Sequence, residues 1–221
     1  MGTSTPGMSM NKVIHRAVRR DLDRFRSALA AFSDGDREGA AALHRAWANF
    51  DAQLTDHHEG EHEVVWPALD AINIARPTID SFDVEHEAMA ADLTTARHAM
   101  ERLRGSASRA DADAAAVAMT KLQTTTVTHL DHEEQETEQI LAQHHNHPAI
   151  KEMGRKFSRR SSPAKAGAFF AWIQDGAATE ELAALRAHVP RPVMTVLSGL
   201  FGRRYRHEVA VVWAKGTGSS R

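Results

Sequence analysis

The chain of 221 residues contains no cysteine and only one tyrosine, Tyr205. Without cysteine it has no disulfide and no thiolate metal ligand, so nitrogen and oxygen atoms would have to hold any metal ion. The formal net charge is −2, which gives no electrostatic footprint for a nucleic acid. No stretch approaches the roughly 20 apolar residues of a membrane span. The sequence therefore predicts a soluble cytoplasmic protein with neither nucleic acid nor membrane as a partner.

Apolar residues recur at three- and four-residue steps from about residue 11 to residue 147, a spacing typical of amphipathic helices. Turn-forming stretches divide this region into four helices. We expect the third helix to begin with Asp80 or Ser81 as its cap, and the fourth to begin near Asp111 or Asp113. Four helices with short connections predict an all-α, up-down four-helix bundle.

The rest of the chain differs in composition from this region. The passage KEMGRKFSRRSSPAKAG is basic and contains several serines, whereas AFFAWI and the leucine-spaced segments after it need an apolar surface to pack on. We expect a disordered segment at 1–10, the bundle at 11–147, a basic linker at 148–167 and a helical C-terminal extension at 168–221 that packs on the bundle.

Every predicted bundle helix carries residues able to bind a metal ion on its otherwise apolar inward face. They are His15 on the first helix, His57 and Glu61 on the second, His86 on the third, and His129 and Glu133 on the fourth. In both His-x-x-x-Glu pairs the two residues share a face, one helical turn apart. In an up-down bundle these positions converge at one end, which predicts a single metal site.

The residue types indicate a pair of ions. Two metal ions held a few ångströms apart repel each other, and carboxylates that bridge them supply compensating negative charge. Glu61 and Glu133 fit this bridging role, while neutral imidazoles occupy the terminal positions. A mixture of histidine and carboxylate ligands favours two non-haem iron ions, with manganese or zinc as alternatives.

The motif HHEGEHEVVWPAL resembles the HHE signature of the hemerythrin-like family, and HLDHEEQETEQIL at 129–141 resembles its fourth-helix counterpart. His15 and the EHEAM around His86 stand in the expected places. The resemblance spans about residues 11–145. It implies a four-helix bundle with a non-haem di-iron centre, bridged by two carboxylates and an oxo or hydroxo group, that binds dioxygen or reacts with related oxidants.

The chain departs from the oxygen-carrying members of that family. They carry a His-x-x-x-His pair on the third helix, whereas Ala90 follows His86 by four residues here. They also tend to end the fourth-helix motif with an aspartate at a longer spacing than that of Glu133. The pattern is closer to the iron-sensing hemerythrin-like domain of an F-box ubiquitin-ligase subunit, in which a residue beside the second-helix histidine also ligates. By that resemblance His58 is a seventh ligand.

Other polar residues near these motifs lie off the inward faces. We expect His62, Glu59 and Glu63 on a solvated face, although His62 could border the site. His132 and Glu134 are expected to point outward. Another group is expected at the end of the fourth helix, where cations interact favourably with the last carbonyl groups, with a second metal site as the alternative: His144, His145 and His147.

Three functions fit this reading, and the sequence leaves all three open. The first is binding of, or reaction with, dioxygen, peroxide or nitric oxide, with a redox protein as partner. The second is an iron or redox sensor that signals through the C-terminal extension. The third is an oxidase or oxygenase for a small organic substrate, which requires a larger pocket. If the protein is an enzyme, it is an oxidoreductase.

Overall fold

The computed structural model of the chain describes residues 8–216, and no strand occurs among them. The bundle region consists of α1 (Met10–Ala30), α2 (Arg37–Gly60), the π-helix η1 (Glu61–Val65), α3 (Trp66–Ala71), α4 (Arg76–Ser106) and α5 (Arg109–Gln143). The C-terminal region consists of α6 (Pro148–Arg160), α7 (Pro163–Gln174), α8 (Thr179–His188), α9 (Arg191–Phe201), the π-helix η2 (Tyr205–Ala210) and α10 (Val211–Gly216). Most of the segment predicted to be disordered, residues 1–7, lies outside the described range.

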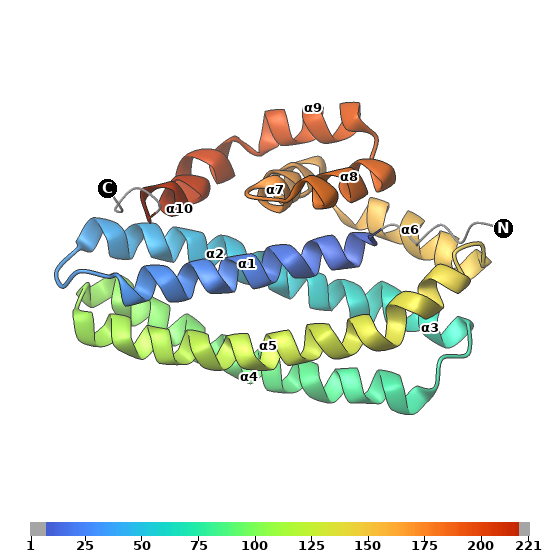
Figure 1. Cartoon of the computed structure of the whole chain (residues 1–221), viewed down its shortest axis with the longest axis horizontal. Helices are drawn as coiled ribbons and strands as arrows, with labels where there is room; N and C mark the ends of the chain where they lie inside the picture. The colour runs from blue at the N-terminus through green and yellow to red at the C-terminus, as the bar shows by residue number, and fades with distance from the viewer. Residues whose placement is uncertain (1–7, 217–221) are drawn as a thin grey trace.

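The long helices α1, α2, α4 and α5 run side by side along the length of the molecule (Figure 1). Helix α1 contacts α2 and α5, and α4 contacts the same two helices, so the four form a closed ring. This confirms the predicted all-α, up-down bundle with additional C-terminal helices. None of the helices within the described range is long and apolar enough to cross a membrane.

The later bundle helices begin earlier than predicted. Helix α4 begins at Arg76 instead of at a cap formed by Asp80 or Ser81. Pro77 explains the difference, because its fixed φ and missing N–H suit the first helical turn. Helix α5 begins directly after Ser108, whose hydroxyl oxygen accepts a backbone N–H of the first turn at 3.1 Å.

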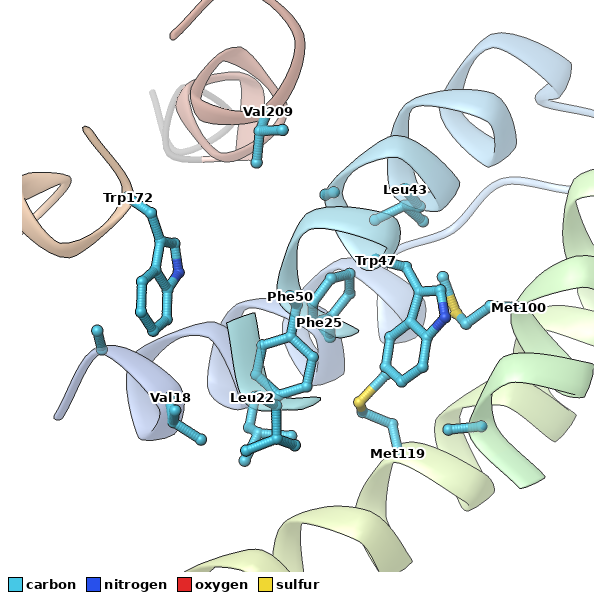
Figure 2. Close-up of a cluster of buried hydrophobic side chains, with 14 of the residues drawn as sticks. Val18, Leu22, Phe25, Leu43, Trp47, Phe50, Met100, Met119, Trp172 and Val209 are labelled. Atoms are coloured by element: carbon cyan, nitrogen blue, oxygen red, sulfur yellow. The ribbon is translucent and has the colours of Figure 1, made fainter. Parts of the chain in front are cut away.

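Aromatic side chains fill the core where the bundle meets the C-terminal helices (Figure 2). Phe25 of α1 makes edge-on contacts with Trp47 and Phe50 of α2, with ring centroids 5.8 and 5.7 Å apart. A third edge-on contact joins it to Trp213 of α10 at 5.0 Å. These geometries are favourable for aromatic pairs. The bundle and the C-terminal helices therefore share one apolar core.

Helices α7, α8 and α10 lie against α1 and α2, and with α9 packed on α7 they form a C-terminal layer (Figure 1). A buried polar contact joins the layer to α1: the indole N–H of Trp172 donates to Oδ2 of Asp21 at 2.7 Å. Arg20 and Arg24 donate to the other oxygen of Asp21 at 2.9 and 3.1 Å. The carboxylate of Asp21 is only 1% exposed, so these donors supply the partners that a buried charge requires.

The segment predicted as a basic linker at 148–167 is helical over most of its length. His147 caps α6 by accepting the N–H of Ala149 at 3.2 Å, and Pro148 occupies the first turn. Ile150 and Met153 then pack against the apolar cluster around α3. Composition alone favoured a loop, because the spaced apolar residues that hold α6 in place are few and none is fully buried.

Candidate metal centre

A π-helical turn lies at the centre of the HHE motif. In η1 the N–H of Trp66 bonds to the carbonyl of Glu61, five residues earlier. Pro67 follows, and a proline ring crowds the carbonyl four residues before it, so a regular α-helix cannot continue unchanged. Isolated π-turns of this kind occur often at functional sites. This one places Glu61 at the junction between α2 and η1.

Two groups of side-chain donors meet at this end of the bundle. In each group one donor atom per residue lies within 4.8 Å of the others. The first group is His15, His57, Glu61 and Glu133, and the second is His58, Glu61, His86 and His129. All seven residues predicted as ligands therefore come together, from α1, α2, η1, α4 and α5. Their assignment as ligands stays a prediction.

Glu61 is the residue that the two groups share. Its Oε1 lies 3.0 Å from Nε2 of His57, in the first group. Its Oε2 lies 3.3 Å from Nε2 of His86, in the second group. One carboxylate thus presents one oxygen to each group, the arrangement that a bridging ligand needs. Glu133 belongs to the first group only, so its predicted bridging role stays a prediction.

The histidines of each group direct ring nitrogens toward each other. Nε2 of His15 lies 3.2 Å from Nε2 of His57, and Nε2 of His86 lies 3.0 Å from Nε2 of His129. Burial, followed by the neighbouring imidazoles, lowers the pKa of His57 well below that of an ordinary histidine. Burial likewise lowers the pKa of His86 to about 3. Neutral imidazoles with a free lone pair are the form that binds a metal ion.

The remaining histidines follow two patterns. Burial lowers the pKa of His58 and His129, so these rings are also neutral near pH 7. Burial alone would lower the pKa of His15, but hydrogen bonds with Glu133 and Glu134 outweigh it and the net shift is upward. Nε2 of His15 lies 3.2 Å from Oε2 of Glu133. Without a metal ion, His15 and Glu133 therefore form a buried ion pair.

The two buried carboxylates differ in their surroundings. Burial, and then the adjacent Glu133, raises the pKa of Glu61 well above its ordinary value. For Glu133 burial also acts upward, but the hydrogen bond and charge of His15 outweigh it and the pKa is lowered. Asn11 supports Glu133 by donating to its Oε1 at 3.2 Å. Glu61 has no such support from the described residues.

Several buried donor atoms in both groups lack hydrogen bonds. They are both carboxylate oxygens of Glu61 and Nε2 of His58. A buried polar atom without a partner costs free energy. Metal cations would satisfy these three atoms at once, and the set of five imidazoles and two carboxylates suits first-row transition metals. The residues present therefore fit a metal centre.

A second set of side chains surrounds the two donor groups. These side chains contact the outer nitrogens of three of the histidines, meaning the ring nitrogens that point away from the groups. Nδ1 of His15 lies 2.9 Å from Oε1 of Glu134, and Nδ1 of His129 lies 2.8 Å from Oε2 of Glu85. Nδ1 of His86 instead lies 3.1 Å from Nε2 of His62. Carboxylate partners such as Glu134 and Glu85 fix the tautomer and orientation of metal-binding histidines.

These outer partners correct two predictions. Glu134 was expected to point outward but contacts His15, and His132 lies 2.8 Å from Glu85 rather than in solvent alone. His62 is exposed and contacts His86, in line with the expectation of a solvated residue that could border the site. Glu85 was missed altogether. Its position directly before His86 placed it at the level of the predicted site and was the available signal, because an inner histidine of the neighbouring helix needs a carboxylate for its second nitrogen.

Aromatic rings form a wall beside the second donor group. The Trp66 ring stacks on His86 with centroids 5.7 Å apart, and its other neighbour, Phe82, lies 5.4 Å away. Phe82 also makes an edge contact with His129 at 6.1 Å. Phe82 and Met89 are buried. This wall limits the access of water to His86 and His129.

Other residues of the motifs have structural roles. Nδ1 of His144 lies 2.9 Å from the carbonyl of Ile140, and Nδ1 of His145 lies 2.8 Å from that of Ala142, as expected at a helix C-terminus. Tyr205 is buried in the C-terminal layer, where its hydroxyl donates to Oδ2 of Asp175 at 2.9 Å. It belongs to neither donor group.

Two shallow surface hollows lie away from the donor groups. One runs along α5 beside Val117 and Lys121, and the other lies beside Leu200 and His207 in the C-terminal layer. Neither borders Glu61, so neither offers an organic substrate a place next to the two donor groups.

Comparisons with known proteins agree with this geometry. The family model described as the hemerythrin HHE cation binding domain matches residues 10–141, from the first residue of α1 to the last turn of α5. Comparisons with curated proteins and with solved structures found no match.

Proposed function

This chain belongs to the hemerythrin HHE cation-binding family, and from that premise we propose that its bundle holds two iron ions and binds or reacts with dioxygen, peroxide or nitric oxide. The observation that carries the proposal is the position of Glu61, with one carboxylate oxygen toward each donor group. Two adjacent donor groups that share a carboxylate favour a bridged pair of ions over two ions bound independently.

Each donor group would hold one of the two ions. His15, His57 and Glu133 would hold one ion, and the other would be held by His58, His86 and His129, with Glu61 between them. When bound, an iron pair supplies electrons and an open coordination position for a small oxidant. Trp66 and Phe82 exclude bulk water from one side. Glu134 and Glu85 keep the imidazoles of His15 and His129 oriented.

Elemental analysis tests the ion pair. We expect about two irons per chain, with a visible absorption band that bleaches on anaerobic reduction and returns in air. Replacing Glu61 with alanine should leave no more than one iron per chain, whereas Glu87→Ala, an exposed glutamate beside His86, should keep two. Two irons in both the Glu61→Ala and Glu133→Ala chains would refute the bridging assignment.

The iron-loaded chain can then be used to distinguish the three proposed reactions. A spectrum that changes with dioxygen and reverses under vacuum indicates reversible binding. Evolution of oxygen from added peroxide indicates peroxide breakdown. A spectral change with nitric oxide alone indicates its capture. An absence of all three responses in a chain that holds iron would contradict the proposal.

A second candidate function is iron or redox sensing through the C-terminal helices. Helix α6 packs on η1, which begins at Glu61, and two of its side chains reach the end of α2. Arg160 donates to the carbonyl oxygen of Asp56 at 2.9 Å and to the carboxylate of Glu63 at 2.7 Å. The Phe157 ring lies so close to Gly60 that a Cβ there would be 2.8 Å from it. A change in the conformation of this segment would therefore alter its contacts with α6.

Limited proteolysis distinguishes this second function. If α6 responds to the metal ions, their removal should speed cleavage between residues 148 and 162 and leave the bundle intact. Arg160→Ala should give fast cleavage with and without metal, while Arg155→Ala, on the same helix but away from η1, should behave like the wild type. Equal cleavage with and without metal would exclude sensing through α6.

A further inference from the structure

Three inner histidines have a partner at the ring nitrogen that points away from the donor groups, and one of these partners is not a carboxylate. His15 and His129 each meet a glutamate carboxylate, whereas Nδ1 of His86 meets Nε2 of His62 at 3.1 Å. The His62 side chain is 47% exposed, while that of His86 is 7% exposed. His86 therefore reaches the inner donor groups with one ring nitrogen and a solvent-exposed imidazole with the other.

A carboxylate completes this outer group. Oδ1 of Asp83 lies 3.4 Å from Nδ1 of His62, and the Asp83 side chain is 41% exposed. The indole N–H of Trp66 donates to the same oxygen at 2.9 Å, which leaves the second carboxylate oxygen of Asp83 available. His62, Asp83 and His86 present donor atoms within 4.8 Å of one another. Two imidazoles and one carboxylate are a favourable donor set for divalent first-row transition metals.

Resting on the proposed function, we propose that His62, Asp83 and Nδ1 of His86 form a loading site, a separate solvent-exposed site that binds a divalent transition-metal ion on its way to the inner pair. The ion takes the place of the hydrogen between the facing nitrogens of His62 and His86, and the displaced proton passes to solvent. Water fills the open coordination positions, because His62 is exposed and Asp83 is half-buried.

The position of the loading site supports this role. His15, His129, Glu61 and Glu133 have side chains no more than 2% exposed, so an ion in solvent cannot reach them directly. His57 and His58 are partly exposed. Among the described residues, however, no further group of three donors includes either of them as the loading site includes His86. His86 is thus the inner ligand that an ion can approach through a preformed exterior site.

Uptake and release rates test the loading site. The metal-free full-length chain is mixed with Fe²⁺ without oxygen, and release from the loaded chain is followed with a chelator. We expect His62→Ala to slow both uptake and release by about tenfold or more and to leave the final two ions per chain and their affinity unchanged. A site on the route to a binding site changes the two rates together, because it does not alter the end states.

Two further variants complete the test. Asp83→Asn retains an oxygen for the indole N–H of Trp66 but removes the charge, and it should slow both rates as His62→Ala does. His98→Ala, an exposed histidine farther along α4, should load and release as the wild type does.

The outcomes separate this inference from the proposed function. Wild-type rates in His62→Ala would overturn the loading site. Faster release with weaker affinity would also overturn it, because this result would mean that His62 only orients His86. If the wild-type chain takes up no metal ion, the proposed function itself is wrong.

Discussion

Nδ1 of His15 lies 2.9 Å from Oε1 of Glu134, although the two residues come from opposite ends of the bundle sequence. The His15 side chain is fully buried and that of Glu134 is 22% exposed. Glu134 also accepts a hydrogen bond from Arg19 at 2.8 Å. A residue of α5 that helical spacing places off the inward face thus fixes the ring of an inward-facing residue of α1.

The contact between Glu134 and His15 predicts an effect on metal affinity. Glu134→Gln keeps the shape but removes the charge that holds the His15 ring, so metal affinity should fall by about 10- to 100-fold. Competition with a chelator of known affinity measures this change. Glu87→Gln, an exposed glutamate without a role at the site, is the matched control and should bind as the wild type does. Unchanged affinity in Glu134→Gln would contradict the orienting role.

Glu61 and Glu133 should respond in opposite ways to loss of their charge in the metal-free protein. Glu61 is buried without hydrogen bonds, so Glu61→Gln should raise the melting temperature by about 2 to 8 °C, or roughly 1 to 2 kcal/mol for a chain of this size. Glu133 pairs with His15, so Glu133→Gln should lower the melting temperature. Thermal unfolding with a chelator present measures both. Shifts of the same sign would contradict the different environments assigned to the two residues.

The raised pKa of Glu61 also makes the stabilisation expected for Glu61→Gln depend on pH. A carboxyl group whose pKa is higher in the folded than in the unfolded state binds more protons when folded, so metal-free stability falls as pH rises above the ordinary value of 4.5. Glu61→Gln removes the ionisable group and with it this pH dependence of stability. The difference in melting temperature between Glu61→Gln and the wild type should therefore shrink as the pH is lowered toward 4.5, and a constant difference would contradict it.

The C-terminal layer should depend on the hydrogen bond between Trp172 and Asp21. Trp172→Phe preserves most of the packing but removes the N–H that donates to a buried carboxylate. We expect a loss of about 1 to 3 kcal/mol in the free energy of unfolding, measured by chemical denaturation. Val193→Ala, an exposed position of α9, serves as control and should change stability little. Equal stability of Trp172→Phe and the wild type would show that Arg20 and Arg24 alone satisfy Asp21.

The helical periodicity of the sequence determined the bundle and the inward position of the candidate ligands. His57 and Glu61, like His129 and Glu133, are four residues apart, and any helix places such a pair on one face. Because the apolar residues identify which face is buried, the sequence also predicted that these pairs meet His15 and His86 inside the bundle. His58 lies beside this face and required the family resemblance.

Tertiary structure decided which outward-facing side chains contact the inner ones. Periodicity places Glu85 and Glu134 outside the core stripe, but the rotation of each helix and the closeness of its neighbour determine that they reach His129 and His15. The π-turn at Glu61 and the packing of α6 on it likewise depend on contacts between distant segments. Local spacing fixes the face of a single helix, whereas the meeting of two helix edges is a property of the assembled bundle.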